Sequence, residues 1–477
     1  MLGKPHEECG LFGIYNQDDL DVAEKTYLAL YALQHRGQAS AGIAVNQNGK
    51  ISFHKDVGMV PEVFHESDLE ELGQGQMAVG HVRDASNDKR DRVSAQPLSM
   101  RYVKGPLVIA HNGALSNFSK VREELEEGGA IFQTTTDAEM IAYTIARQRL
   151  NTGTIEQAVE LAMDKLEGAY SLIIMTPGKL VGARDPQGFR PLALGKCGNS
   201  YMLASESCAF DSIGGEFIRD VEPGEIIVIN KEGLKSVKAK CGRKSSLCIF
   251  EYVYFSRPDS IVDGVSVNIA RQEAGKILAR EHPVEADMVC GVPDSGLDAA
   301  LGFSQVSGIP FGYGLLKNKY TGRAFVYGKR ELVENSVRVK MTALKESVRG
   351  KRLVLIDDSI VSGGTSAYIV KILREAGARE VHMRVSSPPF LYPCYFGTDI
   401  SSKNNLIARE MDLEQIRRHL DVDSLGYLSI EGVRSIAGNS RLGICDACFS
   451  GNYPIPVSEE HREDKFQQKA GKINMTE

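Results

Sequence analysis

Short apolar runs alternate with polar and glycine-rich stretches through the first half of the chain. Residues 10–15 and 41–45 are apolar runs of strand length, and segments of helical periodicity separate such runs. Strands mixed with helices in this irregular way are typical of a layered α+β domain. The pattern therefore predicts a first domain of this class over residues 9–240.

The second half of the chain follows a more regular order. Apolar runs at 353–356 and 381–385 flank a segment of helical periodicity at 366–376, which Gly377 ends. Because strands that alternate with helices usually pair in parallel, this order predicts an α/β domain with a parallel sheet. We place this second domain at residues 241–458.

A polar and basic stretch at 235–246 lies between the two patterns. A chain of 477 residues is too long for one hydrophobic core, so we place the boundary between two domains there. A surface hairpin would have the same composition. Residues 459–477 are charged and have little to bury, which predicts a mobile tail.

Composition and charge exclude several classes of protein. Hydrophobic residues make up 42% and charged residues 25% of the chain, as in soluble globular proteins. The formal net charge of −6, without a long basic run, predicts no binding to nucleic acid or to an anionic membrane. No apolar run approaches the roughly 18 residues of a spanning helix, and the stretch before Cys9 is too short for a signal peptide. We therefore expect a cytoplasmic protein.

The most informative motif is a strand, two acids, a small-residue loop and a helix at 353–366. A loop rich in Gly, Ser and Thr at a helix N-terminus directs backbone N–H groups and the helix dipole at an anion, which favours phosphate. The adjacent carboxylates Asp357 and Asp358 would repel phosphate but suit ribose hydroxyls and Mg²⁺. The motif predicts a phosphorylated sugar as ligand, although an ordinary strand-to-helix connection would explain the glycine-rich turn alone.

This motif resembles the phosphoribosyl pyrophosphate (PRPP) signature of the type I phosphoribosyltransferases. The resemblance implies that the two acids contact the ribose and that the loop binds the 5-phosphate. The implied PRPP-binding residues of this motif are Asp357, Asp358, Ser359, Ile360, Val361, Gly363, Gly364 and Thr365. Ser362 and Gly364 depart from the amidotransferase members of the family, where arginine and threonine are usual, and both changes would weaken phosphate binding.

Two further segments resemble parts of the same PRPP site. Residues 291–295 follow an apolar run and look like the pyrophosphate and Mg²⁺ loop of the family. The implied Mg²⁺ ligands are Ser295, Asp357 and Asp358. A polar stretch at 317–340 resembles the mobile lid that closes over the pyrophosphate and excludes water, and a solvated basic loop is the alternative. The implied PRPP-binding residues of the lid are Lys317, Arg338 and Lys340.

Cys9 precedes a glycine-flanked strand, which we expect to leave its thiol accessible. A lone cysteine is usually inert, but this one is followed by four polar motifs. These motifs lie at 35–38, 80–83, 111–113 and 134–137. Together they resemble the N-terminal-nucleophile glutaminases, specifically the class found in the glutamine PRPP amidotransferases. The resemblance covers residues 7–450 and implies a four-layer glutaminase domain followed by the phosphoribosyltransferase domain.

Glutaminase chemistry explains these residue types, because amide hydrolysis needs a nucleophile, a base and donors that bind the oxyanion. Removal of a propeptide of residues 1–8 would free the α-amino group of Cys9, which would act as the base beside its own thiol. By resemblance, the side chain of Asn112 and the N–H of Gly113 form the oxyanion hole.

The resemblance also implies a set of glutamine-binding residues, in which Arg83 holds the carboxylate and Asp137 the α-ammonium group. The implied set is Arg36, Arg83 and Asp137. Three neighbouring positions depart from the family pattern, where an acid, a tyrosine and an asparagine are expected. These positions are Ala39, Asp84 and Ala114. An impaired glutaminase that relies on free ammonia is therefore an alternative.

The nine cysteines have irregular spacing and do not resemble the framework of a disulfide-rich secreted domain. Cys445 and Cys448 form a C-x-x-C pair, which is compatible with zinc, a redox disulfide or a cluster. Together with Cys248 and Cys394 they resemble the [4Fe–4S] ligands of the iron–sulfur branch of the amidotransferase family. Four thiolates without histidine fit that cluster, and a structural zinc site is the alternative.

The resemblance implies that glutamine, PRPP and water give 5-phosphoribosylamine, glutamate and pyrophosphate, the first step of purine biosynthesis. It also implies Mg²⁺ and a [4Fe–4S] cluster as cofactors, feedback inhibition by purine nucleotides, and a homotetramer. One alternative is a regulatory relative that binds PRPP or nucleotides, which the five departures from the family pattern would favour. Another is a glutaminase that supplies ammonia to a different sugar phosphate, which Asp357 and Asp358 argue against.

Overall fold

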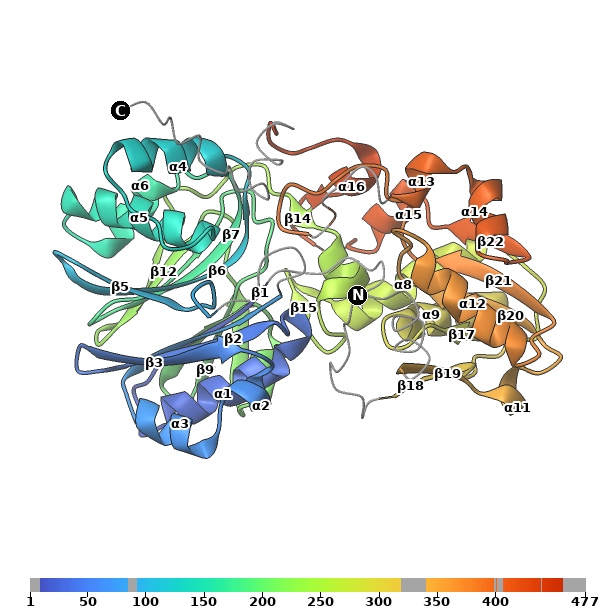
Figure 1. Cartoon of the computed structure of the whole chain (residues 1–477), viewed down its shortest axis with the longest axis horizontal. Coiled ribbons are helices and arrows are strands. Elements are labelled where there is room, and N and C mark those ends of the chain that lie inside the picture. Colours follow the sequence, from blue (N-terminus) through green and yellow to red (C-terminus); the bar gives the residue numbers. More distant parts are fainter. Residues whose placement is uncertain are drawn as a thin grey trace, which may run out of the picture.

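The computed structural model describes residues 9–84, 92–318, 340–398, 400, 406–438 and 440–457. Two domains lie side by side, with the first domain on the left of Figure 1 and the second on the right. The predicted propeptide and the predicted charged tail, residues 1–8 and 459–477, lie outside the described residues. Within the described ranges, no helix is long and apolar enough to cross a membrane.

Two antiparallel sheets form the centre of the first domain. The seven-stranded sheet contains, in spatial order, β11 (Glu216–Asp220), β9 (Ala193–Cys197), β10 (Ser200–Ala204), β1 (Cys9–Tyr15), β4 (Met77–Arg83), β2 (Ser40–Gln47) and β3 (Lys50–Val57). The six-stranded sheet contains β13 (Gly233–Val237), β12 (Ile226–Asn230), β8 (Leu180–Arg184), β7 (Gly168–Met175), β6 (Gly105–Leu115) and β5 (Leu98–Tyr102). The sheets stack face to face because each has an apolar inner face, with Leu11, Val79, Ile173 and Leu203 in the core between them.

Helices cover the outer face of each sheet (Figure 1). The helices on the seven-stranded sheet are α1 (Val22–Ala32), α2 (Val60–Val63), α3 (Glu66–Leu72) and α7 (Cys208–Asp211). Those on the six-stranded sheet are α4 (Phe118–Glu127), α5 (Asp137–Leu150) and α6 (Ile155–Ala162). The resulting order of helices, sheet, sheet and helices confirms the predicted four-layer α+β domain.

The second domain is built on a sheet of four parallel strands. In spatial order these are β17 (Met288–Gly291), β20 (Arg352–Asp357), β21 (Glu380–Val385) and β22 (Ser424–Tyr427). The strands predicted at 353–356 and 381–385 lie within β20 and β21. The predicted helix between them is α12 (Gly364–Glu375), and Gly377, with φ of 95°, follows its end. The prediction of an α/β domain with a parallel sheet is confirmed.

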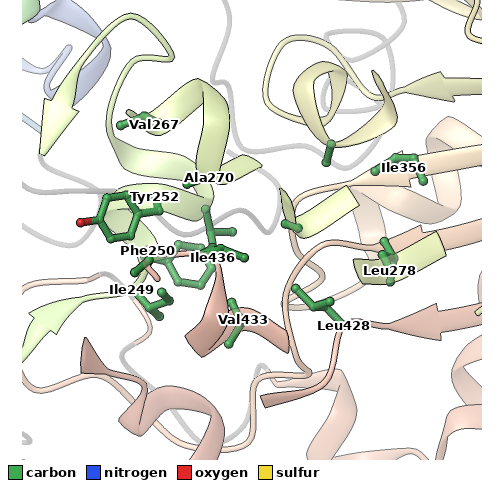
Figure 2. Close-up of a cluster of buried hydrophobic side chains, with 14 of the residues drawn as sticks. Ile249, Phe250, Tyr252, Val267, Ala270, Leu278, Ile356, Leu428, Val433 and Ile436 are labelled. Carbon is green, nitrogen blue, oxygen red and sulfur yellow. The ribbon is translucent and has the colours of Figure 1, made fainter. Parts of the chain in front are cut away.

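Helices cover both faces of this sheet. α8 (Val267–Glu281) and α9 (Gly296–Ser307) pack on one face, and α12 and α14 (Leu413–His419) pack on the other. Figure 2 shows the first of these cores, in which Leu278 of α8 lies near Ile356 of β20 and Leu428. The same core continues to Phe250 and Tyr252, so the segment that enters the second domain is anchored in its interior.

Shorter elements complete the second domain. They are β14 (Leu247–Cys248), a π-helical turn (Glu251–Phe255), β15 (Ile261–Val262), β16 (Val265–Ser266), β18 (Leu315–Lys317), β19 (Met341–Ala343), α11 (Lys345–Val348), α13 (Ile407–Glu410), α15 (Ile430–Ser435), β23 (Ile444–Cys445) and α16 (Ala447–Ser450). β13 still belongs to a sheet of the first domain, whereas β14 pairs in parallel with β23 near the end of the second. The chain therefore passes from strand pairing in the first domain to strand pairing in the second within the polar stretch where we place the domain boundary.

Buried ion pairs join the two domains. Arg184 of β8 donates to Asp263 with an Nη2–Oδ2 distance of 2.8 Å. Arg36 contacts Glu251 with an Nη2–Oε1 distance of 3.0 Å, and all four side chains are buried or nearly so. Removing one partner of a buried pair typically costs about 3–5 kcal/mol, because the other charge stays buried alone. These pairs therefore hold the domains in one relative position.

Candidate active sites

Cys9 begins β1 at an inner position of the seven-stranded sheet. It lies opposite Arg83 at the end of β4. A Cβ atom on the next residue, Gly10, would lie 2.9 Å from Cγ2 of Val82, so this glycine permits close packing rather than exposure. Cys9 is buried, and the expectation of an accessible thiol, which rested on the flanking glycines, is wrong.

The side chains of Cys9 and Asn112 come from facing strands. Residues two apart on a strand share a face, and Leu11 lies in the core between the sheets, so Cys9 also faces the second sheet. The same alternation on β6 places Asn112 on the face of Ala110, which lies in that core. The candidate nucleophile and the candidate oxyanion donor therefore face the same space between the sheets.

One edge of β6 presents the second candidate oxyanion donor, because β5 pairs only with the earlier part of that strand. On this edge the N–H of His111 donates to Oε1 of Gln96 at 2.8 Å. The N–H of Leu115 donates to Oδ2 of Asp137 at 2.8 Å. Alternate N–H groups of a strand point to the same side, so the N–H of Gly113 lies between these two. Asp137, the implied ligand of the glutamine ammonium group, is thus at the same edge as the implied oxyanion hole.

The backbone at Gly113 requires glycine. Its φ is 130°, and a Cβ atom there would lie 2.2 Å from the carbonyl oxygen of Ala169. Gly397 of the second domain also packs here, since a Cβ atom on Gly397 would lie 3.0 Å from the carbonyl carbon of Gly113. The second domain therefore touches the backbone of the candidate oxyanion hole.

Arg36 lies next to the backbone of Cys9 in a buried ion cluster. Its Nε donates to the carbonyl oxygen of Cys9 at 3.3 Å, while its Nη atoms donate to Glu206 and Glu251. Burial opposes ionisation of Glu206, but its interactions with His35 and Arg36 outweigh burial and hold the pKa of that carboxyl well below its usual range. The guanidinium of Arg36 is thus bound to carboxylates of the protein, and its predicted role in glutamine binding stays a prediction.

The three departures from the glutaminase pattern surround this site. Ala39 is buried, and its backbone N–H donates to the carbonyl oxygen of Arg83 at 2.7 Å. This bond does not need the acid that the family pattern has at that position, so the backbone of Arg83 stays held. Ala114 follows Gly113 on β6, and Asp84 is the last described residue before 85–91.

The predicted phosphate loop connects β20 to α12. Asp357 and Asp358 are fully buried, and Asp358 accepts a hydrogen bond from the hydroxyl of Ser359. Gly363 precedes the helix with φ of 79°, in the left-handed region that favours glycine. A Cβ atom on Gly364 would meet no described atom within 4 Å, so the family's threonine would have space there.

The predicted pyrophosphate loop follows β17 and contacts the phosphate loop. The hydroxyl of Ser295 donates to Oδ2 of Asp358 at 2.5 Å. A Cβ atom on Gly291 would lie 2.5 Å from the carbonyl oxygen of Gly296, so the loop folds back closely on α9. The implied Mg²⁺ ligands, including Asp357, therefore lie together at the carboxyl ends of adjacent parallel strands, where α/β sheets bind ligands.

Two of the three predicted lid residues are described. Lys317 ends β18, and its Nζ lies 2.8 Å from Oδ2 of Asp294 in the pyrophosphate loop. Lys340 precedes β19, and its carbonyl oxygen accepts the N–H of Asn318 at 2.9 Å. Arg338 lies outside the described residues.

The four candidate cluster cysteines converge on one apolar cavity. Cys248 lies directly opposite Cys445 in the pairing of β14 with β23. The cavity is lined by Cys248, Cys394, Cys445 and Cys448 together with Phe189, Phe250 and Phe396. Burial raises the pKa of the Cys248 thiol to about 12. Across the described ranges, no three His, Cys, Asp or Glu side chains are positioned to hold a single metal ion.

Sequence reasoning assigned no role to several buried polar residues that contact the site. Glu206 and Glu251 position Arg36, and His81 and Gln96 contact the backbone of His111. A possible signal was a polar residue inside an apolar run, such as His81 within 77–82. That signal does not say which group the side chain contacts.

Comparison with known proteins assigns both halves of the chain. A model of the glutamine amidotransferase domain matches residues 82–212, and a model of the phosphoribosyl transferase domain matches residues 266–387. A protein that joins these two domains is a glutamine-dependent pentosyltransferase.

The chain is 48% identical to the amidophosphoribosyltransferase of Synechocystis sp., over 97% of this chain and 94% of that protein. It is 46% identical to the amidophosphoribosyltransferase of Archaeoglobus fulgidus, over 95% of this chain and 100% of that protein. The chain therefore belongs to the amidophosphoribosyltransferase family, as the sequence motifs predict.

Solved structures of the family share the fold. One is the glutamine PRPP amidotransferase from Bacillus subtilis complexed with ADP and GMP, with a TM-score of 0.88 and 44% identity over 95% of this chain and 98% of that one. Another, described as the allosteric regulatory enzyme of purine biosynthesis, has a TM-score of 0.89 and 43% identity over 95% and 97% of the two chains. The predicted glutaminase and phosphoribosyltransferase folds are confirmed.

Proposed function

We propose that this chain converts glutamine, PRPP and water into 5-phosphoribosylamine, glutamate and pyrophosphate, as the first step of purine biosynthesis. The observation that carries the proposal is that Cys9 and Asn112 face the same space between the two sheets of the first domain, with the N–H of Gly113 at the adjacent edge of β6. A thiol opposite two oxyanion donors is the arrangement that acyl transfer from an amide needs.

In the glutaminase half, the thiol sulfur of Cys9 attacks the side-chain carbonyl carbon of glutamine. The Asn112 side chain and the Gly113 N–H stabilise the oxyanion, while Arg83 binds the glutamine carboxylate and Asp137 its ammonium group. The α-amino group of Cys9 accepts the thiol proton and passes it to the leaving nitrogen, which departs as ammonia. Water then hydrolyses the thioester to glutamate. This base exists only if the peptide bond between Glu8 and Cys9 has been cleaved.

In the transferase half, ammonia attacks the anomeric carbon of PRPP as the bond to pyrophosphate breaks. The 5-phosphate binds the loop from Ser359 to Thr365 at the N-terminus of α12, and Asp357 and Asp358 bind the ribose hydroxyls. Bound Mg²⁺ would neutralise charge on the leaving pyrophosphate. Its protein ligands would be Ser295 and the two carboxylates, a set of oxygen donors that suits this ion. Lys317, Arg338 and Lys340 would contact the pyrophosphate from the lid.

The first prediction concerns the nitrogen donor. We expect the protein to consume PRPP with glutamine and also with ammonium chloride, because the two domains carry separate reactions. The measurement is pyrophosphate release with each donor, together with glutamate formation. Activity with ammonia alone would mean that Ala39, Asp84 and Ala114 impair the glutaminase. Activity with neither donor would favour a regulatory relative and reject the proposal.

We also propose that Cys248, Cys394, Cys445 and Cys448 hold a [4Fe–4S] cluster. The donor set fits, because four thiols without histidine line one apolar cavity. They come from three segments that are far apart in the sequence, so the cluster would crosslink the folded chain as a structural metal does. Cluster binding would require the thiols to lose their protons.

The second prediction tests this cluster. Protein purified without oxygen should be brown and contain about four irons and four sulfides per chain. Cys445→Ser and Cys448→Ser should each lose most of the iron and unfold at a lower temperature. Cys197→Ser is the matched control, because Cys197 lies on β9 in the first domain, away from the cavity, and should keep the iron. A content of one zinc per chain and no iron would mean that the four cysteines form a zinc site instead of a cluster. A metal-free protein of unchanged stability would reject a metal site at these cysteines.

Regulation, assembly and location complete the proposal. The Bacillus subtilis relative was solved with ADP and GMP, which supports feedback inhibition of this chain by purine nucleotides. We further propose a homotetramer in the cytoplasm, with glutamine and PRPP as the substrates and with no nucleic acid or membrane partner.

A further inference from the structure

His81 lies between the two sheets of the first domain, close to the candidate glutaminase site. It stands on β4 two residues before Arg83, directly opposite Leu11 of β1. Its side chain is fully buried and faces the six-stranded sheet, because it shares the face of Leu11. Its Nε2 lies 3.1 Å from the carbonyl oxygen of His111 on β6. The contact thus joins the strand that carries Arg83 to the strand that carries Asn112.

A second buried side chain binds the same residue of β6. Oε1 of Gln96 accepts the N–H of His111 at 2.8 Å, and Gln96 is buried. On a regular sheet the N–H and the C=O of His111 would both bond to a neighbouring strand. β5 pairs with β6 only up to Ile109. Beyond the end of this pairing, the side chains of His81 and Gln96 bind the C=O and the N–H of His111.

This position matters because His111 directly precedes Asn112 and Gly113. β5 no longer pairs with β6 beyond Ile109, yet the direction of β6 must be fixed there to aim the oxyanion donors. We propose that His81 and Gln96 are positioning residues for the oxyanion hole: they hold the backbone of β6 at His111 so that the donors of the next two residues point at the reacting carbonyl. The inference rests on the proposed glutaminase function and adds two residues to it.

The hydrogen bond defines the chemical state of His81. A carbonyl oxygen only accepts, so Nε2 must carry the proton. Burial lowers the pKa of His81 to about 3, so the imidazole is neutral in the working range of the enzyme. His81 therefore acts as a fixed donor and does not transfer a proton in the reaction.

The experiment compares His81→Leu with His81→Gln. Leucine removes the donor, whereas the amide of glutamine places an N–H near the former Nε2. We expect His81→Leu to lower kcat for glutamine-dependent synthesis about 10-fold or more, with KM for glutamine and the ammonia-dependent rate nearly unchanged. His81→Gln should keep kcat within about 3-fold of the unmodified enzyme and keep its pH profile. Equal losses in both variants would mean that the imidazole itself takes part in catalysis and would overturn the inference.

A second readout separates the oxyanion hole from the nucleophile. Alkylation of Cys9 by iodoacetamide forms no oxyanion, so its rate should be the same in His81→Leu and in the unmodified enzyme. A parallel fall of alkylation and kcat would place the effect on Cys9 or on the whole domain, which would contradict a role in positioning β6.

His54→Leu is the matched control. Nε2 of His54 also lies 3.0 Å from a backbone carbonyl oxygen, that of Val63, on the outer side of the same domain. This variant loses the same kind of bond and should keep the glutamine-dependent kcat. If Cys9→Ser also retained glutamine-dependent activity, the proposed function would fail. If only Cys9→Ser lost that activity and His81→Leu did not, the positioning inference alone would fail.

Discussion

Replacing Cys9 by serine is expected to abolish glutamine-dependent synthesis and to leave ammonia-dependent synthesis nearly intact. The hydroxyl of serine is a much weaker nucleophile than a thiolate, and loss of a catalytic nucleophile commonly lowers kcat by on the order of 10³-fold or more. The transferase reaction should continue, because Asp357 and Asp358 lie at the end of β20 in the other domain. The measurement is pyrophosphate release with saturating glutamine or with ammonium chloride.

Cys197→Ser is a useful control for this variant, because Cys197 is a second thiol of the same domain and lies on β9 rather than β1. It should keep both activities. Intact mass of the active protein adds a test of the base: we expect Cys9 as the first residue, since only then is an α-amino group beside the thiol. An active protein that retains Met1 to Glu8 would contradict this mechanism, and loss of both activities in Cys9→Ser would contradict the separation of the two sites.

The fold could be predicted from the sequence where the local pattern of apolar residues matches the burial that the neighbouring elements give each segment. β20 contains a continuous apolar run at 353–356, as expected for a strand buried on both faces, and α12 ends where Gly377 takes a left-handed conformation. β21 instead alternates apolar residues with His382 and Arg384, and its strand structure follows from that alternation. In the first domain the irregular order of strands predicted the class, but not which strands become neighbours. β1, for example, pairs with β4 and β10, which begin 68 and 191 residues after it.

The candidate site could be predicted only in part, for a physical reason. Cys9, Asn112 and the two acids of the phosphate loop belong to motifs that are contiguous in sequence. Glu251 contacts Arg36 although the two residues are 215 positions apart in the sequence, and no local pattern around either residue predicts that contact. Flanking glycines suggested an accessible thiol at Cys9, whereas Gly10 instead permits close packing, because the outcome depends on what fills the space beside it.

Asp358→Asn is expected to lower synthesis by on the order of 10²-fold with glutamine and with ammonia alike, as when one electrostatic stabiliser is removed from an active site. The side chain is fully buried and keeps its size in this variant, so the main change is the loss of a charge proposed to act on ribose and Mg²⁺. That charge serves the PRPP reaction and not the delivery of ammonia. Glu285→Gln, an exposed carboxylate of the same domain, is the control and should keep both rates. A fall with glutamine alone would contradict the placement of PRPP.

Ser295→Ala sharpens the Asp358 test, because the Ser295 hydroxyl donates to Asp358 at 2.5 Å and joins the two predicted PRPP loops. If both residues serve one Mg²⁺ and pyrophosphate site, the double variant should lose less than the product of the two single losses, since each change already breaks the shared contact. The measurement is kcat/KM for PRPP in the four proteins, with ammonium chloride as nitrogen donor so that the glutaminase plays no part. Independent, multiplicative losses would place Ser295 and Asp358 in separate roles, whereas a raised Mg²⁺ requirement in both single variants would tie the shared contact to the metal.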